Sequence, residues 1–249
     1  MLESLLPPEL SAFVGLALLG ISFLGSFITA AFGIGGGVVV LAVFASLLSP
    51  AALIPVHGVI QFGSNAGRTL IMREHISRPV FIPFLIGALA GVAIGGLVVF
   101  DLPPALIQIA VGLFILWTIV AKPPAFLRHS AWVAGGFSSF LTMFFGATGP
   151  FVAAYIKTLG FDRMTHVGTH AACMTLQHGM KVIAFGILGF AFGPYIPLIV
   201  GMIAFGFLGT VVGRKVLMKI DEQRFKLILN CILIVLSLRL IWAGASTYL

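Results

Sequence analysis

Long apolar segments, most of them long enough to span a membrane as a helix, constrain the fold of this chain more than any other feature. They cover roughly residues 10–31, 52–71, 79–100, 103–121, 130–146, 164–191, 194–214 and 225–245, with shorter ones at 36–48 and 150–159. Only 8% of the 249 residues are charged, whereas a soluble domain has about 25%. Because a spanning helix needs about 20 apolar residues, the sequence predicts an all-α polytopic membrane protein.

Two breaks containing glycine interrupt the apolar segments. Their sequences are Phe32-Gly33-Ile34-Gly35-Gly36-Gly37 and Phe145-Gly146-Ala147-Thr148-Gly149-Pro150. A membrane protein tolerates irregular backbone only where it is buried in protein or lines a watery cavity. Each break precedes one of the two short segments, so we predict short or broken helices there, either tilted spans or halves of re-entrant hairpins. The breaks then form a substrate site; the alternative is that glycine only permits close helix packing.

An internal repeat relates the two halves of the chain at a constant offset of 113 residues. It pairs Phe32 with Phe145, Gly33 with Gly146, Gly36 with Gly149, His57 with His170, Asn65 with His178, and Arg68 with Lys181. We expect an N-terminal transmembrane repeat over 1–121, a cytoplasmic linker over 122–129 and a C-terminal repeat over 130–249. Each half crosses the membrane an odd number of times, which predicts two inverted repeats of about five helical segments each. Transporters often have this design, with the site at the repeat interface.

The basic residues predict how the chain is oriented. The turn from Arg73 to Arg78, the linker, the turn at Lys157 and Arg163, and the cluster from Arg214 to Lys226 fall on one predicted side. Glu3, Glu9, Asp101 and both chain ends fall on the other. Cytoplasmic loops are enriched in Lys and Arg, so we predict a multi-pass protein of the inner membrane with both termini in the periplasm.

The helices that start after the breaks suggest an anion site. A helix N-terminus has unpaired N–H groups and the positive end of the helix dipole, and it binds anions readily. In an inverted repeat the two N-termini converge from opposite faces, and the hydroxyl of Thr148 adds a further donor.

Polar residues follow the breaks at helical spacing. His57, Gln61, Asn65 and Arg68 share one helix face, as do His170, Gln177, His178 and Lys181. Such residues inside a membrane usually face the bundle interior or a water path. The alternatives are hydrogen bonding between helices for the histidines and anchoring at the membrane interface for Arg68. No Asp or Glu lies within a predicted span, which favours an anionic substrate and leaves histidine as the group that could couple to protons.

The predicted substrate-binding residues are therefore Gly33, Gly35, Gly36, Gly37, His57, Gln61, Gly146, Thr148, Gly149, His170 and Lys181. We predict no catalytic residue, metal or cofactor, because no metal-ligand spacing, activated serine or Gly-Lys-Ser/Thr motif occurs. The expected partners are the small anion and the lipid bilayer, without nucleic acid, and a homo-oligomer is left open. The glycine series Gly87, Gly91, Gly95 and Gly206, Gly209, Gly213 are spaced for close helix crossing.

The chain resembles the sulfite exporter TauE/SafE family of membrane transporters. The resemblance rests on the break from Phe32 to Gly37 at the end of the first span, on the segment from Ala51 through His57 to Arg68, and on the short turn from Arg73 to Arg78 before a glycine-rich span. It extends over essentially the whole chain and implies transport of a small sulfur-containing or organic anion such as sulfite, a sulfonate or sulfoacetate. We expect a secondary transporter that works by alternating access; an anion channel or passive facilitator is the alternative.

Overall fold

A computed structural model describes most of the chain, namely residues 6–7, 10–32, 35–99, 103–121, 124–128, 130–216 and 222–248. The described residues form helices and no strand, so the predicted all-α class is confirmed. The α-helices are α1 (Ala12–Phe32), α2 (Gly36–Leu47), α3 (Pro50–Ile71), α4 (Arg78–Val98), α5 (Pro104–Val120), α6 (Ala131–Phe145), α7 (Gly149–Lys157), α8 (Arg163–Ile187), α9 (Ile196–Val216) and α10 (Glu222–Ala245). Short 3₁₀ turns, η2 (Arg73–His75), η4 (Ala125–Arg128) and η5 (Gly193–Tyr195), lie between them.

The outer helices are apolar enough for a lipid environment. By length and composition, three helical segments among the described residues could each cross a membrane: Ala12–Phe32, Arg78–Val98 and Gly193–Lys215. Large apolar side chains on them face outward, and Phe13 and Leu97 are 80% and 85% exposed. Contiguous exposed apolar surface of this kind is unfavourable in water. The chain is therefore a multi-pass membrane protein.

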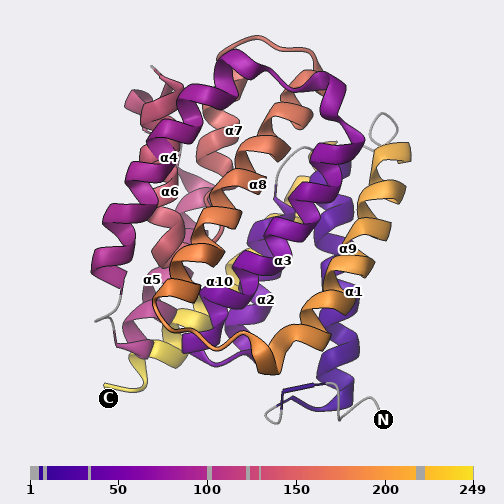
Figure 1. The fold of residues 1–249 in the computed structure, drawn as a ribbon. Coiled ribbons are helices and arrows are strands. Elements are labelled where there is room, and N and C mark those ends of the chain that lie inside the picture. The colour runs from indigo at the N-terminus through magenta and orange to yellow at the C-terminus, as the bar shows by residue number, and fades with distance from the viewer. Residues whose placement is uncertain are drawn as a thin grey trace.

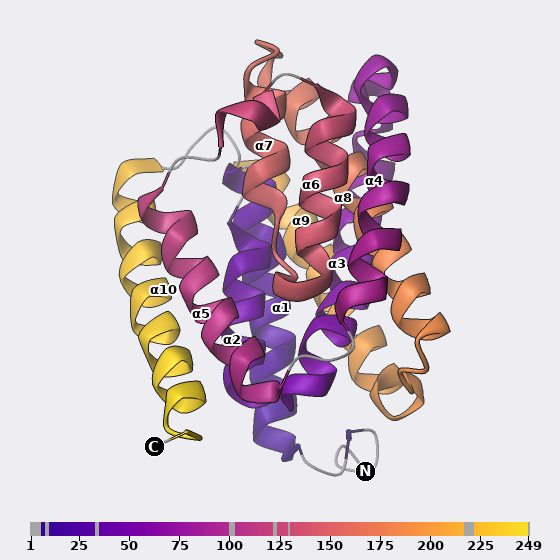
Figure 2. The same ribbon diagram turned by 90° about the vertical axis from the view of Figure 1, so that its left-hand side faces the viewer.

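Helices from the two halves of the chain pair with one another (Figures 1 and 2). The most extensive contacts join α1 to α9, α4 to α6, α3 to α8 and α5 to α10. We match each helix of the first half to the helix five places later, α1 to α6, α2 to α7 and so on. The pair α1–α9 then corresponds to the pair α6–α4, and the pairs α3–α8 and α5–α10 each correspond to themselves. Two halves related by a two-fold axis would pack in this way, which supports the predicted repeat. That repeat and the domain limits drawn from it stay predictions.

The glycine series allow two of these pairs to pack closely. A Cβ atom at Gly87 of α4 would lie 1.9 Å from the carbonyl oxygen of Trp132 on α6. A Cβ atom at Gly209 of α9 would lie 2.1 Å from the carbonyl oxygen of Phe23 on α1. Any larger residue would push these backbones apart, so the predicted role of these glycines in close helix crossing is confirmed.

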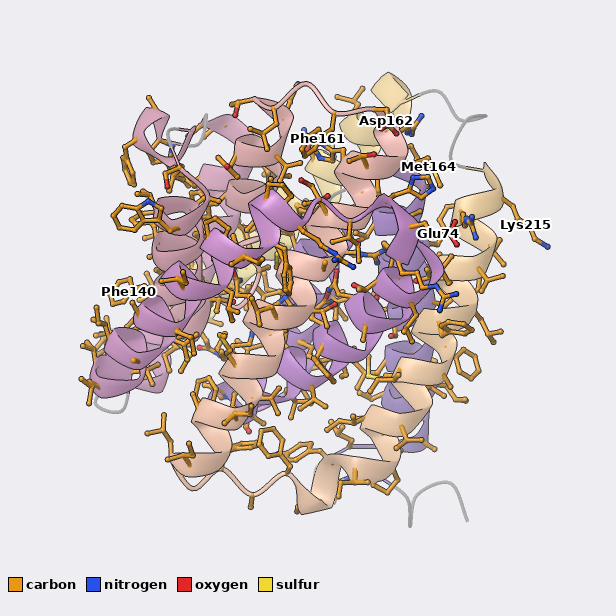
Figure 3. The ribbon with its side chains drawn as sticks, turned by 45° about the horizontal axis from the view of Figure 1, so that its top comes forward. Glu74, Phe140, Phe161, Asp162, Met164 and Lys215 are labelled. Atoms are coloured by element: carbon orange, nitrogen blue, oxygen red, sulfur yellow. The ribbon has the colours of Figure 1, made fainter. Side chains whose placement is uncertain are left out.

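The turns between helices gather at the two ends of the bundle. Both chain ends lie at the bottom in Figure 1, while the loop between α7 and α8 lies at the top. Figure 3 shows Glu74, Asp162 and Lys215, from three separate elements, near one another at that upper end. The two ends match the predicted sides of the chain where residues are described. Glu3, Glu9, Asp101 and Lys122, which were part of that prediction, lie outside the described residues.

The two short helices form the interior of the bundle. α2 has 12 residues and α7 has 9, which at 1.5 Å per residue gives lengths of about 18 Å and about 14 Å. Neither can cross a hydrocarbon core of about 30 Å. Instead α1 with α2, and α6 with α7, form two hairpins that fold back within the bundle (Figure 2). Their side chains are largely buried, including Leu41 and Phe44 of α2 and Val152 of α7.

Candidate functional site

Both breaks place the start of a short helix inside the protein. Gly35 precedes α2 with a φ of 104°, and Gly146 follows α6 with a φ of 78°. L side chains rarely adopt this conformation, which explains glycine at both positions. Neither α2 nor α7 has a side-chain cap on its first turn, although Thr148 occupies the capping position of α7. In α7, Pro150 has no N–H and that of Phe151 donates to the carbonyl oxygen of Thr148, so α7 offers fewer free N–H groups to a ligand than α2 does.

A small cavity of about 30 Å³ lies where the two breaks meet α3 and α8. A single water needs roughly 10–15 Å³ of such volume, so the cavity has room for only a few atoms. It is lined from the first half by Thr29, Gly35, Gly37, Val38, His57, Gln61 and Asn65, and from the second half by Ala147, Gly149, Pro150, His170, Met174 and His178. Both halves of the chain are needed to form it.

The lining follows the 113-residue offset found in the sequence. In four pairs at this offset, both members line the cavity, one from each half of the chain: Gly37 and Pro150, His57 and His170, Gln61 and Met174, and Asn65 and His178. The cavity thus lies where corresponding parts of the two halves meet.

His57 and His170 connect the long helices to the breaks. Nε2 of His57 lies 3.0 Å from the carbonyl oxygen of Gly37, and Nε2 of His170 lies 3.1 Å from that of Gly149. A carbonyl oxygen only accepts, so each Nε2 carries the hydrogen and donates it. Nδ1 of both rings is buried without a hydrogen-bond partner among the described residues, and so is Nδ1 of His178. The His57 and His178 rings are 6.0 Å apart, edge to face.

Two cations flank the cavity. Arg68 is 1% exposed and Lys181 is fully buried. Arg68 donates to Oδ1 of Asn65 at 2.8 Å, and Lys181 Nζ donates to the carbonyl oxygen of Gly146 at 3.4 Å. His57 interacts electrostatically with Lys181, and His170 with Arg68. Because α3 and α8 run in opposite directions, the two cations lie toward opposite ends of the bundle.

No carboxylate balances these two charges within the described part of the chain. Neither Arg68 nor Lys181 forms an ion pair there, and their hydrogen-bond acceptors are neutral oxygens. A buried charge without a partner is costly. An anion bound in the cavity would supply the missing opposite charge.

Two of the predicted contacts have a structural role instead. Thr148 does not line the cavity; its hydroxyl accepts from Nε2 of Gln177 at 2.6 Å, and Oε1 of Gln177 accepts from Ser138 at 2.9 Å. Gly36 packs against α1, where a Cβ atom on it would lie 1.7 Å from the carbonyl oxygen of Gly25. For Gly36, the close-packing alternative describes what is observed.

The remaining predicted residues fall into three groups. Six of them line the cavity: Gly35, Gly37, His57, Gln61, Gly149 and His170. Gly146 and Lys181 lie behind its wall and contact each other. Gly33 lies outside the described residues.

Sequence reasoning left several lining residues out of the site. Asn65 and His178 lie on the helix faces that it identified, and Met174 follows Gln61 at the repeat offset. Applying the offset to the predicted Gln61 would have found Met174, and including the whole polar face of each helix would have found Asn65 and His178. Thr29 carries no comparable signal, because it lies inside α1, ahead of the break.

Comparison with protein families gives a match over nearly the whole chain. The family model described as Sulfite exporter TauE/SafE matches residues 18–240. This range includes every residue of the cavity wall and both flanking cations. Searches among curated proteins and among solved structures found no significant match.

Proposed function

Because the chain belongs to the sulfite exporter TauE/SafE family, a family of transporters rather than enzymes, we propose that it is a secondary transporter of a small sulfur-containing or organic anion. Sulfite, a sulfonate and sulfoacetate are the candidate substrates. The proposed mechanism is alternating access across the bacterial inner membrane.

One observation carries the proposal: two half-helix N-termini, one from each half, open into a single buried cavity. Gly35 and Gly149 both line that cavity at the start of their helices. The positive ends of two helix dipoles and their unpaired N–H groups suit a small anion. Arg68 and Lys181 add two positive charges without a carboxylate nearby among the described residues. No carboxylate among the described residues would balance an added cation in this setting.

The helix pairing supports alternating access. The cavity lies between α2 and α3 of one half and α7 and α8 of the other, so a relative movement of the halves would open it toward one end or the other. Inverted-repeat transporters move in this way around a fixed central site. Arg68 would lie toward the opening at the end with the basic turns, and Lys181 toward the opening at the end with the chain termini.

A second cavity, of about 300 Å³, supports a path toward the end with the termini. Pro50, Ile54, Phe185 and Leu188 contribute to its largely apolar lining. A Cβ atom at Gly146 would lie 3.3 Å from Ile54 of this cavity and 3.2 Å from Nδ1 of His57 in the central one. Gly146 thus lies close to residues of both cavities, and its movement would connect them. An apolar vestibule would also accept the organic part of a sulfonate.

The orientation follows from the charge distribution. The helices and turns that begin or end at the upper end of the bundle in Figure 1 carry six basic residues there, namely Arg73, Arg78, Lys157, Arg163, Arg214 and Lys215. By the positive-inside rule we place this end in the cytoplasm and both chain termini in the periplasm. A reporter that is active only in the periplasm should therefore be active when it is fused to either terminus. A reporter that is active only in the cytoplasm should be inactive there.

Counterflow distinguishes the proposed carrier from a channel. Liposomes containing the protein and loaded with unlabelled sulfite should take up labelled sulfite transiently above its equilibrium level, and uptake should saturate. An anion conductance without counterflow would instead establish the channel alternative. Protein-free liposomes measure the passive flux.

A further inference from the structure

The central cavity contains histidine nitrogens whose hydrogen-bonding state is fixed by the fold. Nε2 of His57 and Nε2 of His170 donate to the carbonyl oxygens of Gly37 and Gly149. A neutral imidazole carries one hydrogen. Nδ1 of each ring is therefore a bare lone pair in the neutral form, and it is buried without a partner among the described residues. A Cβ atom at Gly146 would lie 3.2 Å from Nδ1 of His57, so this nitrogen lies beside the second break.

These lone pairs conflict with a bound anion. An anion presents its own lone pairs, and two acceptors facing one another without a hydrogen between them repel. Leaving a buried acceptor unpaired costs free energy as well. One hydrogen placed between Nδ1 and the anion turns the repulsion into a charge-assisted hydrogen bond, which is among the strongest kinds in proteins.

The surroundings supply no such hydrogen from a carboxylic acid. The titratable and charged groups around His57 are Lys181 and His178 of α8. Those around His170 are Arg68 of α3 and His166 and His178 of its own helix. α2 and α7 contribute the carbonyl groups of Gly37 and Gly149. No Asp or Glu is among these neighbours. The cations Arg68 and Lys181 can donate to the anion themselves, and a hydrogen between Nδ1 and the anion in addition to theirs would come from solution together with the anion.

We propose that the transporter takes up its anion together with one proton, held between the anion and Nδ1 of His57 or of its counterpart His170. This inference rests on the proposed transport function and extends it. The only covalent bond that forms and breaks is the N–H or O–H bond of the proton itself: anion and proton enter from the water on one side and leave together on the other. A monovalent anion then crosses without net charge. The substrate class is thus a small oxyanion. For a sulfonate the proton resides on the imidazole ring, and for the more basic sulfite it resides on the ring or on the anion.

The two bound species must stabilise one another. If the proton strengthens anion binding by some factor, the anion strengthens proton binding by the same factor. The positive charges of Arg68 and Lys181 disfavour a third positive charge nearby until the anion offsets them. The empty transporter then reopens to the first side of the membrane without a proton. Anion flux and proton flux are coupled in this way.

The test uses the full chain in liposomes with labelled sulfite as the probe. Counterflow at equal pH on both sides requires no net proton movement, so it reports on the carrier function alone. A gradient of one pH unit, acidic outside, should then drive about tenfold accumulation of sulfite at one proton per anion. A pH-sensitive dye inside the liposomes should show protons entering with the anion. Protein-free liposomes again give the passive flux of the neutral acid.

Variants assign the proton to the histidines. In the His57→Gln/His170→Gln double variant, the amides can donate to Gly37 and Gly149 but cannot take up a proton. Because both histidines line the cavity, we expect this variant to take up less sulfite in counterflow than the wild type, and we expect the uptake that remains to reach the same accumulation ratio with and without a pH gradient. His75→Gln, in the turn after α3, should keep full accumulation. Wild-type counterflow without any response to the pH gradient or any proton flux overturns the inference and leaves the carrier function standing. Absence of counterflow contradicts both, and full accumulation by the double variant excludes these histidines.

Discussion

His57 and His170 make the same contact in the two halves of the chain: each donates through Nε2 to a carbonyl oxygen in the first turn of a short helix, at 3.0 Å and 3.1 Å. They lie 113 residues apart. The acceptors differ by one position, because the counterpart of Gly37 at this offset is Pro150, whereas His170 binds Gly149. The two bonds hold both helix N-termini against α3 and α8, which fixes the width of the cavity between them.

Replacing Gly36 should destabilise the fold. A Cβ atom there would lie 1.7 Å from the carbonyl oxygen of Gly25 and 2.4 Å from Oγ1 of Thr29, so α1 and α2 would have to separate. Overpacking of this kind costs about 1–3 kcal/mol. We expect Gly36→Ala to lower the melting temperature in detergent by several degrees.

Gly20→Ala is the matched control, because nothing lies within 4 Å of a Cβ atom at Gly20 on the same helix. It should melt at or slightly above the wild-type temperature. If the melting temperature of Gly36→Ala is no lower than that of Gly20→Ala, the result contradicts the close packing of α2 on α1 at Gly36.

Lys181 should strengthen anion binding through its charge. Its ammonium group is fully buried beside the cavity, and its hydrogen bond is to a main-chain carbonyl. Across the cavity wall, at an effective dielectric constant of about 20, its charge contributes on the order of 1–3 kcal/mol, so Lys181→Gln should weaken sulfite binding about 10–100-fold. Ligand-induced shifts in melting temperature measure this affinity, since a ligand that binds only the folded state stabilises it.

Lys157→Gln, at the exposed end of α7, removes the same charge far from the cavity and should bind sulfite as the wild type does. Equal affinities for Lys181→Gln and Lys157→Gln would show that Lys181 is structural.

Asp162 should make the stability of α8 depend on pH in the acid range. Its carboxylate accepts from the hydroxyl and the main-chain N–H of Thr165 and from the N–H of Met164. These hydrogen bonds, led by the Thr165 hydroxyl, hold the pKa of Asp162 below its ordinary value. The stabilisation is therefore present above that ordinary value and is lost as the pH falls through the lowered pKa of the folded protein.

Asp162→Ala should accordingly melt below the wild type at pH 7, and the difference should shrink at pH 3. Glu74→Ala, an exposed carboxylate at the same end of the bundle (Figure 3), should show no such pattern. A difference between Asp162→Ala and the wild type that is independent of pH would contradict the capping role.

The sequence predicted the parts of the molecule that depend on local composition and spacing. Apolar length predicted the membrane helices, the glycine runs predicted the two breaks, and the repeat offset paired His57 with His170, both of which line the cavity. The role of Thr148 was not predictable, because it depends on Gln177 reaching across from α8. The packing of Gly36 on Gly25 likewise depends on how α2 folds back along α1, which no local pattern specifies.

The most direct test of the anion site is sulfite counterflow by Gly149→Leu compared with Gly20→Leu. A Cβ atom at Gly149 would lie 3.5 Å from Nε2 of His170, an ordinary contact, so the rest of the leucine would fill the cavity of about 30 Å³. Gly20→Leu adds the same side chain on the exposed surface of α1. The proposed site predicts wild-type counterflow for Gly20→Leu and none for a folded Gly149→Leu. Wild-type counterflow by Gly149→Leu would contradict it.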